Sequence, residues 1–209
     1  MEMKQAIHKT AVEGAALVKG VVQGEFLRQL IAELENGPFE VAAEDTASVK
    51  QKFDRYAFFE QAPDMPKLTE MQLFAQSLIR LSAEEYPVLS EWTARDIVIQ
   101  RYGADGLLTA HKDLRRHPYL IASFTLTGSC RFELLEKRDG PVVKTMIPEP
   151  GDLVLLRAPG LANDKSVDDR PFHQVSGSLD SGVKRLSLVF RDNHNPDKLI
   201  NGFRYHNKK

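Results

Sequence analysis

The segment HQVSGSLDSGVKRLSLVFR, residues 173–191, decides the fold. Its second half alternates with the period of two that is typical of a β-strand. One face carries the apolar residues Leu186, Leu188 and Phe190. The opposite face carries Arg185, Ser187, Val189 and Arg191. An unpaired charge is costly to bury, so a central strand with this pattern must offer its arginines a partner.

Six segments after residue 95 are short and rich in β-branched or aliphatic residues: 96–102, 119–128, 130–137, 142–147, 152–158 and 184–192. Turn-forming residues separate several of them, as in Gly128-Ser129, Asp139-Gly140-Pro141 and Pro150-Gly151-Asp152. The gaps are too short for helices. The pattern therefore favours a β-sandwich or jelly roll over alternating strands and helices.

The first 95 residues contain helical patterns. One helix is expected at residues 24–38, where Phe26, Leu30 and Leu34 share a face and Asn36-Gly37-Pro38 forms a stop signal. A second is expected at residues 68–87, where Thr69 and Gln72 have capping-box spacing and Pro87 ends the element. Its predicted apolar face consists of Phe74, Leu78 and Leu81.

We expect one domain, 1–209. Residues 1–95 would form a helical support region, with strands and loops at 38–68, and residues 96–193 the β-rich core, followed by a tail at 194–209. The expected fold class is mainly β, with N-terminal helices packed on the major sheet. Leu186, Leu188 and Phe190 would face these helices, and Arg185 and its neighbours would line the interior of the roll.

The composition is that of an ordinary globular protein, with 42% hydrophobic and 27% charged residues. The net charge of −1 argues against a strongly basic nucleic-acid binder. The single cysteine, Cys130, excludes an internal disulfide framework and a Cys-rich zinc site, and fits a reducing cytoplasm.

The start of the sequence makes a poor signal peptide, because Glu13 and Lys19 interrupt its apolar stretches. The sequence contains no apolar run of about 18 residues, the length that a membrane-spanning helix needs. We expect a cytoplasmic protein without membrane contact.

A candidate metal site lies in the β-rich half. In an extended segment, the side chains of His111 and Asp113 point the same way and can chelate one metal ion. His173 follows a polar loop and can supply a third ligand. Two histidines and one carboxylate leave several coordination positions open, which suits non-haem Fe(II) better than a closed structural zinc site. As an alternative, each histidine alone could be a structural residue.

Arg185 and Ser187 form a second candidate site. A planar guanidinium can bind both oxygens of a carboxylate, and a neighbouring hydroxyl can add a hydrogen bond. The counter-charge of Arg185 would then be a ligand. The alternative is an ion pair with a structural acid such as Asp152.

His111-x-Asp113, His173 and Arg185-x-Ser187 together resemble the motif set of the Fe(II)/2-oxoglutarate-dependent oxygenases, over roughly residues 95–193. The fold of that superfamily is a double-stranded β-helix, a jelly roll of the cupin type. QRYGADGLLTAHKD and RLSLVFR are most similar to the AlkB-like branch. Gln100 and Ser187 stand where that branch has asparagines, and an R-x-S pair also resembles the small-molecule oxygenases of the penicillin-synthase type. The first 95 residues show nothing of AlkB's nucleotide-recognition lid.

The resemblance implies a role for each site residue. His111, Asp113 and His173 would hold Fe(II), and 2-oxoglutarate would bind the metal and place its distal carboxylate on Arg185. Ser187 and Tyr102 would hydrogen-bond that carboxylate, with Gln100 nearby on the strand of Tyr102. Arg191 would point into the site, although its place at the strand's end also allows it to reach solvent. With O2, the products would be succinate, CO2 and a hydroxylated or oxidatively demethylated substrate. Halogenation is disfavoured because halogenases lack the carboxylate.

The expected substrate is a small molecule or an amino-acid derivative. One alternative is an AlkB-like demethylase or hydroxylase of nucleic acid or protein, and another is a non-catalytic cupin-like module with a structural metal. Loops 103–118 and 158–170 are candidates for substrate contact. The first carries the basic residues Lys112, Arg115, Arg116 and His117, which could attract an anion or could form a solvated surface. His194 is expected in a turn. The oligomeric state is left open.

Overall fold

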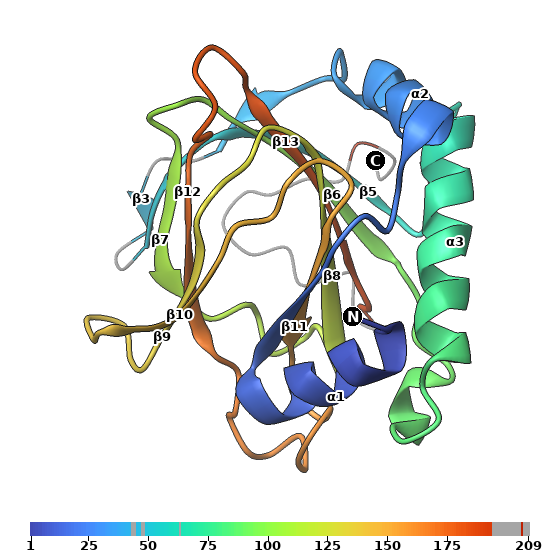
Figure 1. The fold of residues 1–209 in the computed structure, drawn as a ribbon, viewed down its shortest axis with the longest axis vertical. Coiled ribbons are helices and arrows are strands. Elements are labelled where there is room, and N and C mark those ends of the chain that lie inside the picture. Colours follow the sequence, from blue (N-terminus) through green and yellow to red (C-terminus); the bar gives the residue numbers. More distant parts are fainter. Residues whose placement is uncertain (43–44, 47–48, 63, 194–205, 207–209) are drawn as a thin grey trace.

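The computed structural model describes residues 1–42, 45–46, 49–62, 64–193 and 206. Two antiparallel sheets face each other and form a roll, and helices lie against the outer face of the larger sheet (Figure 1). The helices are α1 (Met3–Glu13), α2 (Gly24–Leu34) and α3 (Pro66–Leu81), with a short 3-10 turn η1 (Pro87–Leu89). The expected architecture, mainly β with helices on the major sheet, is confirmed.

The larger sheet has the strand order β1 (Ala15–Val18), β11 (Leu153–Arg157), β8 (Leu120–Thr127), β13 (Arg185–Arg191), β6 (Asp96–Tyr102), β5 (Asp54–Phe59), β2 (Glu40–Val41). The smaller sheet has the order β10 (Val142–Met146), β9 (Phe132–Leu135), β12 (Phe172–Ser176), β7 (Leu107–His111), β4 (Val49–Lys52), β3 (Asp45–Thr46). Strand β13 therefore lies in the middle of the larger sheet, paired with β6 and β8.

The two faces of β13 enter different cores, as its alternation predicts. Leu186, Leu188 and Phe190 pack in the core between the sheet and the helices. Val189 belongs to the second core, which lies between the two sheets. Arg185 shares the face of Val189 and is therefore directed into the roll.

The first 95 residues are not only helical. They also supply β1 and β5 to the larger sheet and β4 to the smaller one, so the roll extends beyond residues 96–193. Gly14, with a positive φ of 92°, ends α1 and lets the chain turn directly into β1. The tail, residues 194–209, lies outside the described residues except for His206, and so does His194.

Helix α2 matches the predicted helix, but α3 differs in its start and its buried face. It begins at Pro66, and Thr69 donates to the carbonyl of Met65, so the predicted cap at Thr69 was wrong. Phe74 and Leu81 are exposed. The buried face consists of Leu68, Met71, Gln72, Ala75 and Ile79. Gln72 fits there because its amide donates to the carbonyls of Glu60 and Ala94.

None of the helices among the described residues combines the length and the apolar character that a transmembrane segment needs.

A carboxylate from α2 caps α3, which gives a test of the fold. Glu33 accepts hydrogen bonds from the backbone N–H groups of Lys67 and Leu68, at 3.1 and 2.7 Å. Because these donors lie at the positive end of the helix dipole, Glu33→Ala should lower the free energy of unfolding by about 1 kcal/mol in urea titrations. The exposed Glu35 provides the matched control Glu35→Ala, which removes the same charge. Equal effects of the two substitutions would contradict the cap.

Candidate metal centre and its two cavities

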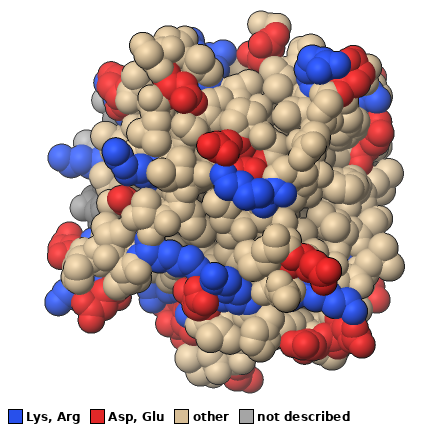
Figure 2. All heavy atoms as spheres, in the orientation of Figure 1, with Lys and Arg blue, Asp and Glu red and all other residues tan. Residues whose placement is uncertain are grey.

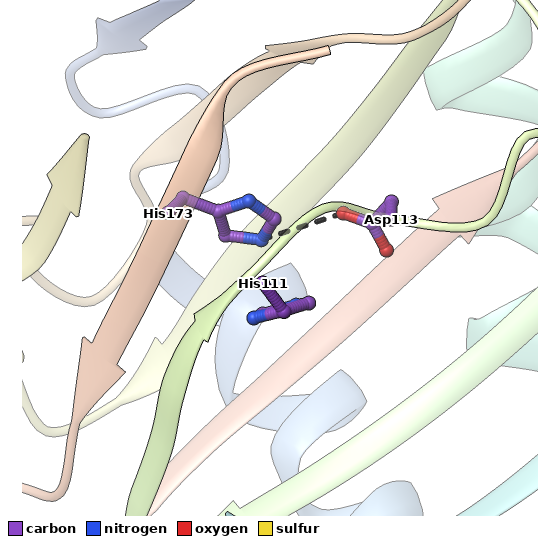
Figure 3. A group of neighbouring side chains, drawn as sticks. All are labelled: His111, Asp113 and His173. Atoms are coloured by element: carbon purple, nitrogen blue, oxygen red, sulfur yellow. Dashed lines mark ion pairs between the residues drawn. The ribbon is translucent and has the colours of Figure 1, made fainter. Parts of the chain in front are cut away.

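Strand pairing brings the two histidines together. His173 on β12 lies opposite His111 on β7, and the centres of their rings are 4.1 Å apart. Asp113 follows the end of β7, and its Oδ2 lies 3.4 Å from Nε2 of His173 (Figure 3). One potential ligand atom from each of the three residues lies within 4.8 Å of the others. This is the spacing that a single metal ion requires, with positions left open for other ligands.

The surroundings keep the three groups in their metal-binding forms. Burial lowers the pKa of His173 to about 3, and it also lowers the pKa of His111. Burial opposes ionisation of Asp113, but the charge of Arg191 and the two imidazoles outweigh it and bring its pKa to about 2. Near neutral pH the site therefore consists of two neutral imidazoles and one carboxylate, which is a suitable ligand set for a divalent cation.

Neighbouring groups orient both imidazole rings. Nδ1 of His111 lies 2.9 Å from the carbonyl of Thr109, and because a carbonyl only accepts, the proton is on Nδ1 and the lone pair on Nε2. The ring of His173 stacks on Phe132, with ring centres 5.3 Å apart and planes tilted by 5°. The rings are therefore held in place before any metal binds.

An inner cavity of about 40 Å³ connects the metal ligands with Arg185. Arg185 is 2% exposed, and its guanidinium lies over the ring of Tyr102, 5.0 Å from the ring centre. Its Nε and Nη1 have no hydrogen-bond partner among the described residues. The alternative partner, Asp152, binds Lys19 at 2.9 Å instead. A buried guanidinium with unused donors in a cavity beside three metal ligands fits the carboxylate of a bound acid.

Of the other predicted cofactor residues, Tyr102, Gln100 and Arg191 line this cavity, and Ser187 does not. Burial raises the pKa of Tyr102, so its hydroxyl keeps a proton to donate. Ser187 is fully buried, and its hydroxyl lies 3.5 Å from the amide oxygen of Gln100. It is not one of the described residues that line the inner cavity; Ser123, which sequence reasoning did not single out, is one of them.

Arg191 points into the site and not toward solvent. Its Nη2 lies 3.4 Å from Oδ1 of Asp113, on the side of the carboxylate that does not face His173. Arg191 also lines the inner cavity and a second, larger one. It therefore helps to hold Asp113 in its ionised form and in its orientation.

The second cavity, called here the outer cavity, has a volume of about 250 Å³. It is lined by Val49, Gln51, Phe53, Arg55, Asp96, Val98, Gln100, Leu108, His111, Lys112, Asp113, Leu114, Arg116, His117 and Arg191. His111 and Asp113 line both cavities, so a metal ion between them would be reached from two sides.

Sequence reasoning missed Asp96 and Arg55, and it left His117 in a basic loop. His117 is in fact buried, and its Nε2 lies 3.4 Å from Oδ2 of Asp96. Burial, followed by the charge of Arg191, lowers the pKa of His117 to about 3. Asp96 could have been identified as a candidate site residue because it is a charged residue in the otherwise largely apolar strand 96–102.

The two loops that were expected to contact substrate meet beside the metal centre. Lys112 pairs with Asp168 at 3.2 Å, and Arg115 donates to the carbonyls of Lys165 and Ser166. Arg170 donates to the backbone carbonyl of Asp113. The loop at 158–170 therefore covers the segment that carries a metal ligand, as a lid would.

Comparisons with known proteins identify the fold. No protein-family model matches the chain, and no curated protein matches its sequence. Among solved structures, a Pseudomonas putida prolyl-4-hydroxylase matches with a TM-score of 0.65 and 15% identity, over 92% of this chain and 99% of that one. A 2OG-Fe(II) oxygenase-family protein from Burkholderia pseudomallei matches with a TM-score of 0.62 and 16% identity, over 91% and 89% of the two chains. OsALKBH1 matches with a TM-score of 0.59 and 15% identity, over 86% and 98%.

These structures confirm the expected fold, the double-stranded β-helix of 2-oxoglutarate–iron(II) oxygenases. The AlkB-like branch, which the sequence resembled most, is one of several branches with this likeness.

The geometry predicts one divalent metal ion per chain. Asp113→Ala and His173→Ala each remove one ligand, and each should weaken Fe(II) binding by about 100-fold or more in calorimetric titrations under nitrogen. His8→Ala, on the exposed side of α1, is the matched control and should bind like the wild-type protein. Unchanged affinity in the Asp113 and His173 variants would place the metal elsewhere.

Proposed function

We propose that this protein is an Fe(II)- and 2-oxoglutarate-dependent oxygenase that hydroxylates, or oxidatively demethylates, a small molecule. The observation that carries the proposal is the placement of Arg185. Its unused donors share one buried cavity with the His111, Asp113 and His173 ligand set. A metal alone would not require this guanidinium, and a diacid that also binds the metal would.

The residues have distinct roles in this proposal. His111, Asp113 and His173 hold the iron, and Arg185 holds the far carboxylate of 2-oxoglutarate, with the hydroxyl of Tyr102 as a second donor. Iron, 2-oxoglutarate and O2 supply the oxidation of a C–H bond, with release of succinate and CO2. The protein positions these groups and excludes water from the inner cavity. Asp113 occupies the position that a halide would need, which favours hydroxylation or demethylation over halogenation.

Arg191 and the β7–β12 pairing keep the ligands in position. Arg191 binds the oxygen side of Asp113 that faces away from His173, and the register between β7 and β12 fixes the two histidines opposite each other. Gln100 lies between the two cavities, since it lines both. It is therefore placed to contact either cosubstrate or substrate.

The outer cavity supports a small substrate. Its volume is about 250 Å³, and His111 and Asp113 form part of its wall, so a bound molecule would lie next to the metal. The segments 112–117 and 158–170 are tied to each other near the metal centre by the Lys112–Asp168 pair and by the hydrogen bonds of Arg115. We therefore favour a small-molecule or amino-acid-like substrate over a polymer.

A second candidate function is oxidation of nucleic acid or protein, since the similar structures include OsALKBH1 and a prolyl hydroxylase in complex with a peptide of hypoxia inducible factor. Two loop cations that could bind a polyanion are already engaged: Lys112 with Asp168, and Arg115 with backbone carbonyls. On the face shown in Figure 2, basic and acidic side chains are interspersed. Salt-sensitive binding of single-stranded oligonucleotides would favour the nucleic-acid alternative.

Arg185→Ala tests the proposal. With Fe(II) and O2, the wild-type protein should convert 2-oxoglutarate to succinate, slowly even without a substrate. The substitution should raise the 2-oxoglutarate concentration for half-maximal turnover by about 100-fold or more, because a charge-assisted pair is lost. Succinate is measured by liquid chromatography.

The exposed Arg131 offers the control Arg131→Ala, which should behave like wild type. Calorimetry with Fe(II) checks that Arg185→Ala still folds and binds metal. A protein that binds Fe(II) but never forms succinate would instead be the non-catalytic metal-binding module.

A further inference from the structure

The outer cavity carries an excess of positive charge. Among the described residues that line it, the cations are Arg55, Lys112, Arg116 and Arg191, and the acids are Asp96 and Asp113. Arg191 faces both acids, at 3.4 Å from Asp113 and 4.0 Å from Asp96. Asp113 and Asp96 also lie 3.4 Å from His173 and His117, respectively. Lys112 pairs with Asp168, which does not line the cavity, at 3.2 Å. In the proposed enzyme, a bound metal ion would neutralise part of the negative charge of Asp113.

Arg55 enters this cavity from the larger sheet. Along β5 it shares a face with Ala57 and Phe59, both of which belong to the core between the sheets. It lies opposite Gln100 on β6, and Arg191 on β13 lies opposite Asp96 at the other end of β6. Two guanidiniums on different strands thus reach one cavity.

The environment of Arg55 agrees with this placement. Burial, followed by the charge of Arg191, lowers the pKa of Arg55 below its ordinary value. Burial disfavours any charge at this position, and the repulsion between Arg55 and Arg191 is the part of the shift that a bound anion would relieve.

The remaining wall is largely apolar. Apart from His111, it consists of Val49, Phe53, Val98, Leu108 and Leu114, together with the polar residues Gln51, Gln100 and His117. An apolar wall with a few converging polar groups is typical of small-molecule sites, in which the polar groups orient the ligand.

We propose that the outer cavity binds a small organic anion, an apolar molecule with one carboxylate or phosphate group, and that Arg55 anchors that group. The inference rests on the proposed function, because it places the carbon to be oxidised beside His111 and Asp113. A planar guanidinium suits either anion, since its fork can donate two parallel hydrogen bonds.

The test compares anions with neutral molecules of the same shape. The protein is loaded with Fe(II) and 2-oxoglutarate under nitrogen. N-acetylleucine and N-acetylphenylalanine are then titrated by calorimetry against their primary amides, and phenyl phosphate against phenol. At least one anion should bind about tenfold or more tighter than its neutral counterpart. The carboxylate and phosphate arms show which group the site prefers.

Two substitutions connect this preference with Arg55. Arg55→Gln should abolish it, and Arg55→Lys, which keeps the charge but loses the fork, should retain part of it. Arg28→Gln on the exposed side of α2 is the control and should keep the full preference. Thermal unfolding followed by circular dichroism verifies that each variant is folded.

Two results would overturn the inference. The first is that no anion binds more tightly than its neutral counterpart, which includes the case that none of them binds. The second is that folded Arg55→Gln keeps the full preference for the anion. Its failure is distinguishable from that of the proposed function. The charge-transfer absorption of the Fe(II)–2-oxoglutarate complex, recorded before each titration, reports on the proposed function alone.

Discussion

The burial of Arg185 in the middle of the larger sheet is the constraint on which the site depends. The strand is paired on both sides, so the side chain cannot turn outward while the register is kept. A shift of one residue would move Leu186, Leu188 and Phe190 into the cavity and two arginines into the helix-facing core. Hydrophobic burial on one face thus holds a guanidinium inside the roll on the other. The free-energy cost of that buried charge is offset when a ligand supplies the anion.

The two sheets contribute different chemistry to the space between them. The smaller sheet and the segment after β7 supply the candidate metal ligands, with His111 and His173 on paired strands and Asp113 just after β7. The larger sheet supplies the cations Arg185, Arg191 and Arg55. In the proposed enzyme, the inner cavity would be the place of the cosubstrate and the outer cavity the place of the substrate, with His111 and Asp113 in the walls of both. Each place has its own arginine from the same sheet face.

The sequence predicted the parts of this arrangement that depend on local periodicity. The alternation in β13 assigned its two faces, and the six predicted strands after residue 95 are all present as β6, β8, β9, β10, β11 and β13. The H-x-D spacing indicated two of the candidate metal ligands, because side chains two residues apart in an extended segment point to the same side. These inferences needed only the geometry of the chain itself.

The features that were missed depend on contacts between distant segments. Strand β7 has few alternating apolar residues: Leu108 packs against the core and Ala110 is buried, but the other residues of the strand are only partly buried. Helix α3 buries Gln72 because carbonyls of other segments accept from it, so its hydrophobic pattern pointed to the wrong face. The roles of Arg55 and of the Asp96–His117 pair depend on β5, β6 and the loop after β7 lying next to one another in the folded chain. No pattern within a single segment predicts such tertiary contacts.

The most direct measurement is a crystal structure of the protein grown under nitrogen with Mn(II), a redox-stable substitute for Fe(II), and 2-oxoglutarate. The account predicts one metal ion bound by His111, Asp113 and His173, with the distal carboxylate of 2-oxoglutarate on the guanidinium of Arg185. A metal bound by other residues, or a guanidinium at position 185 that binds a protein carboxylate while the diacid lies elsewhere, would contradict it.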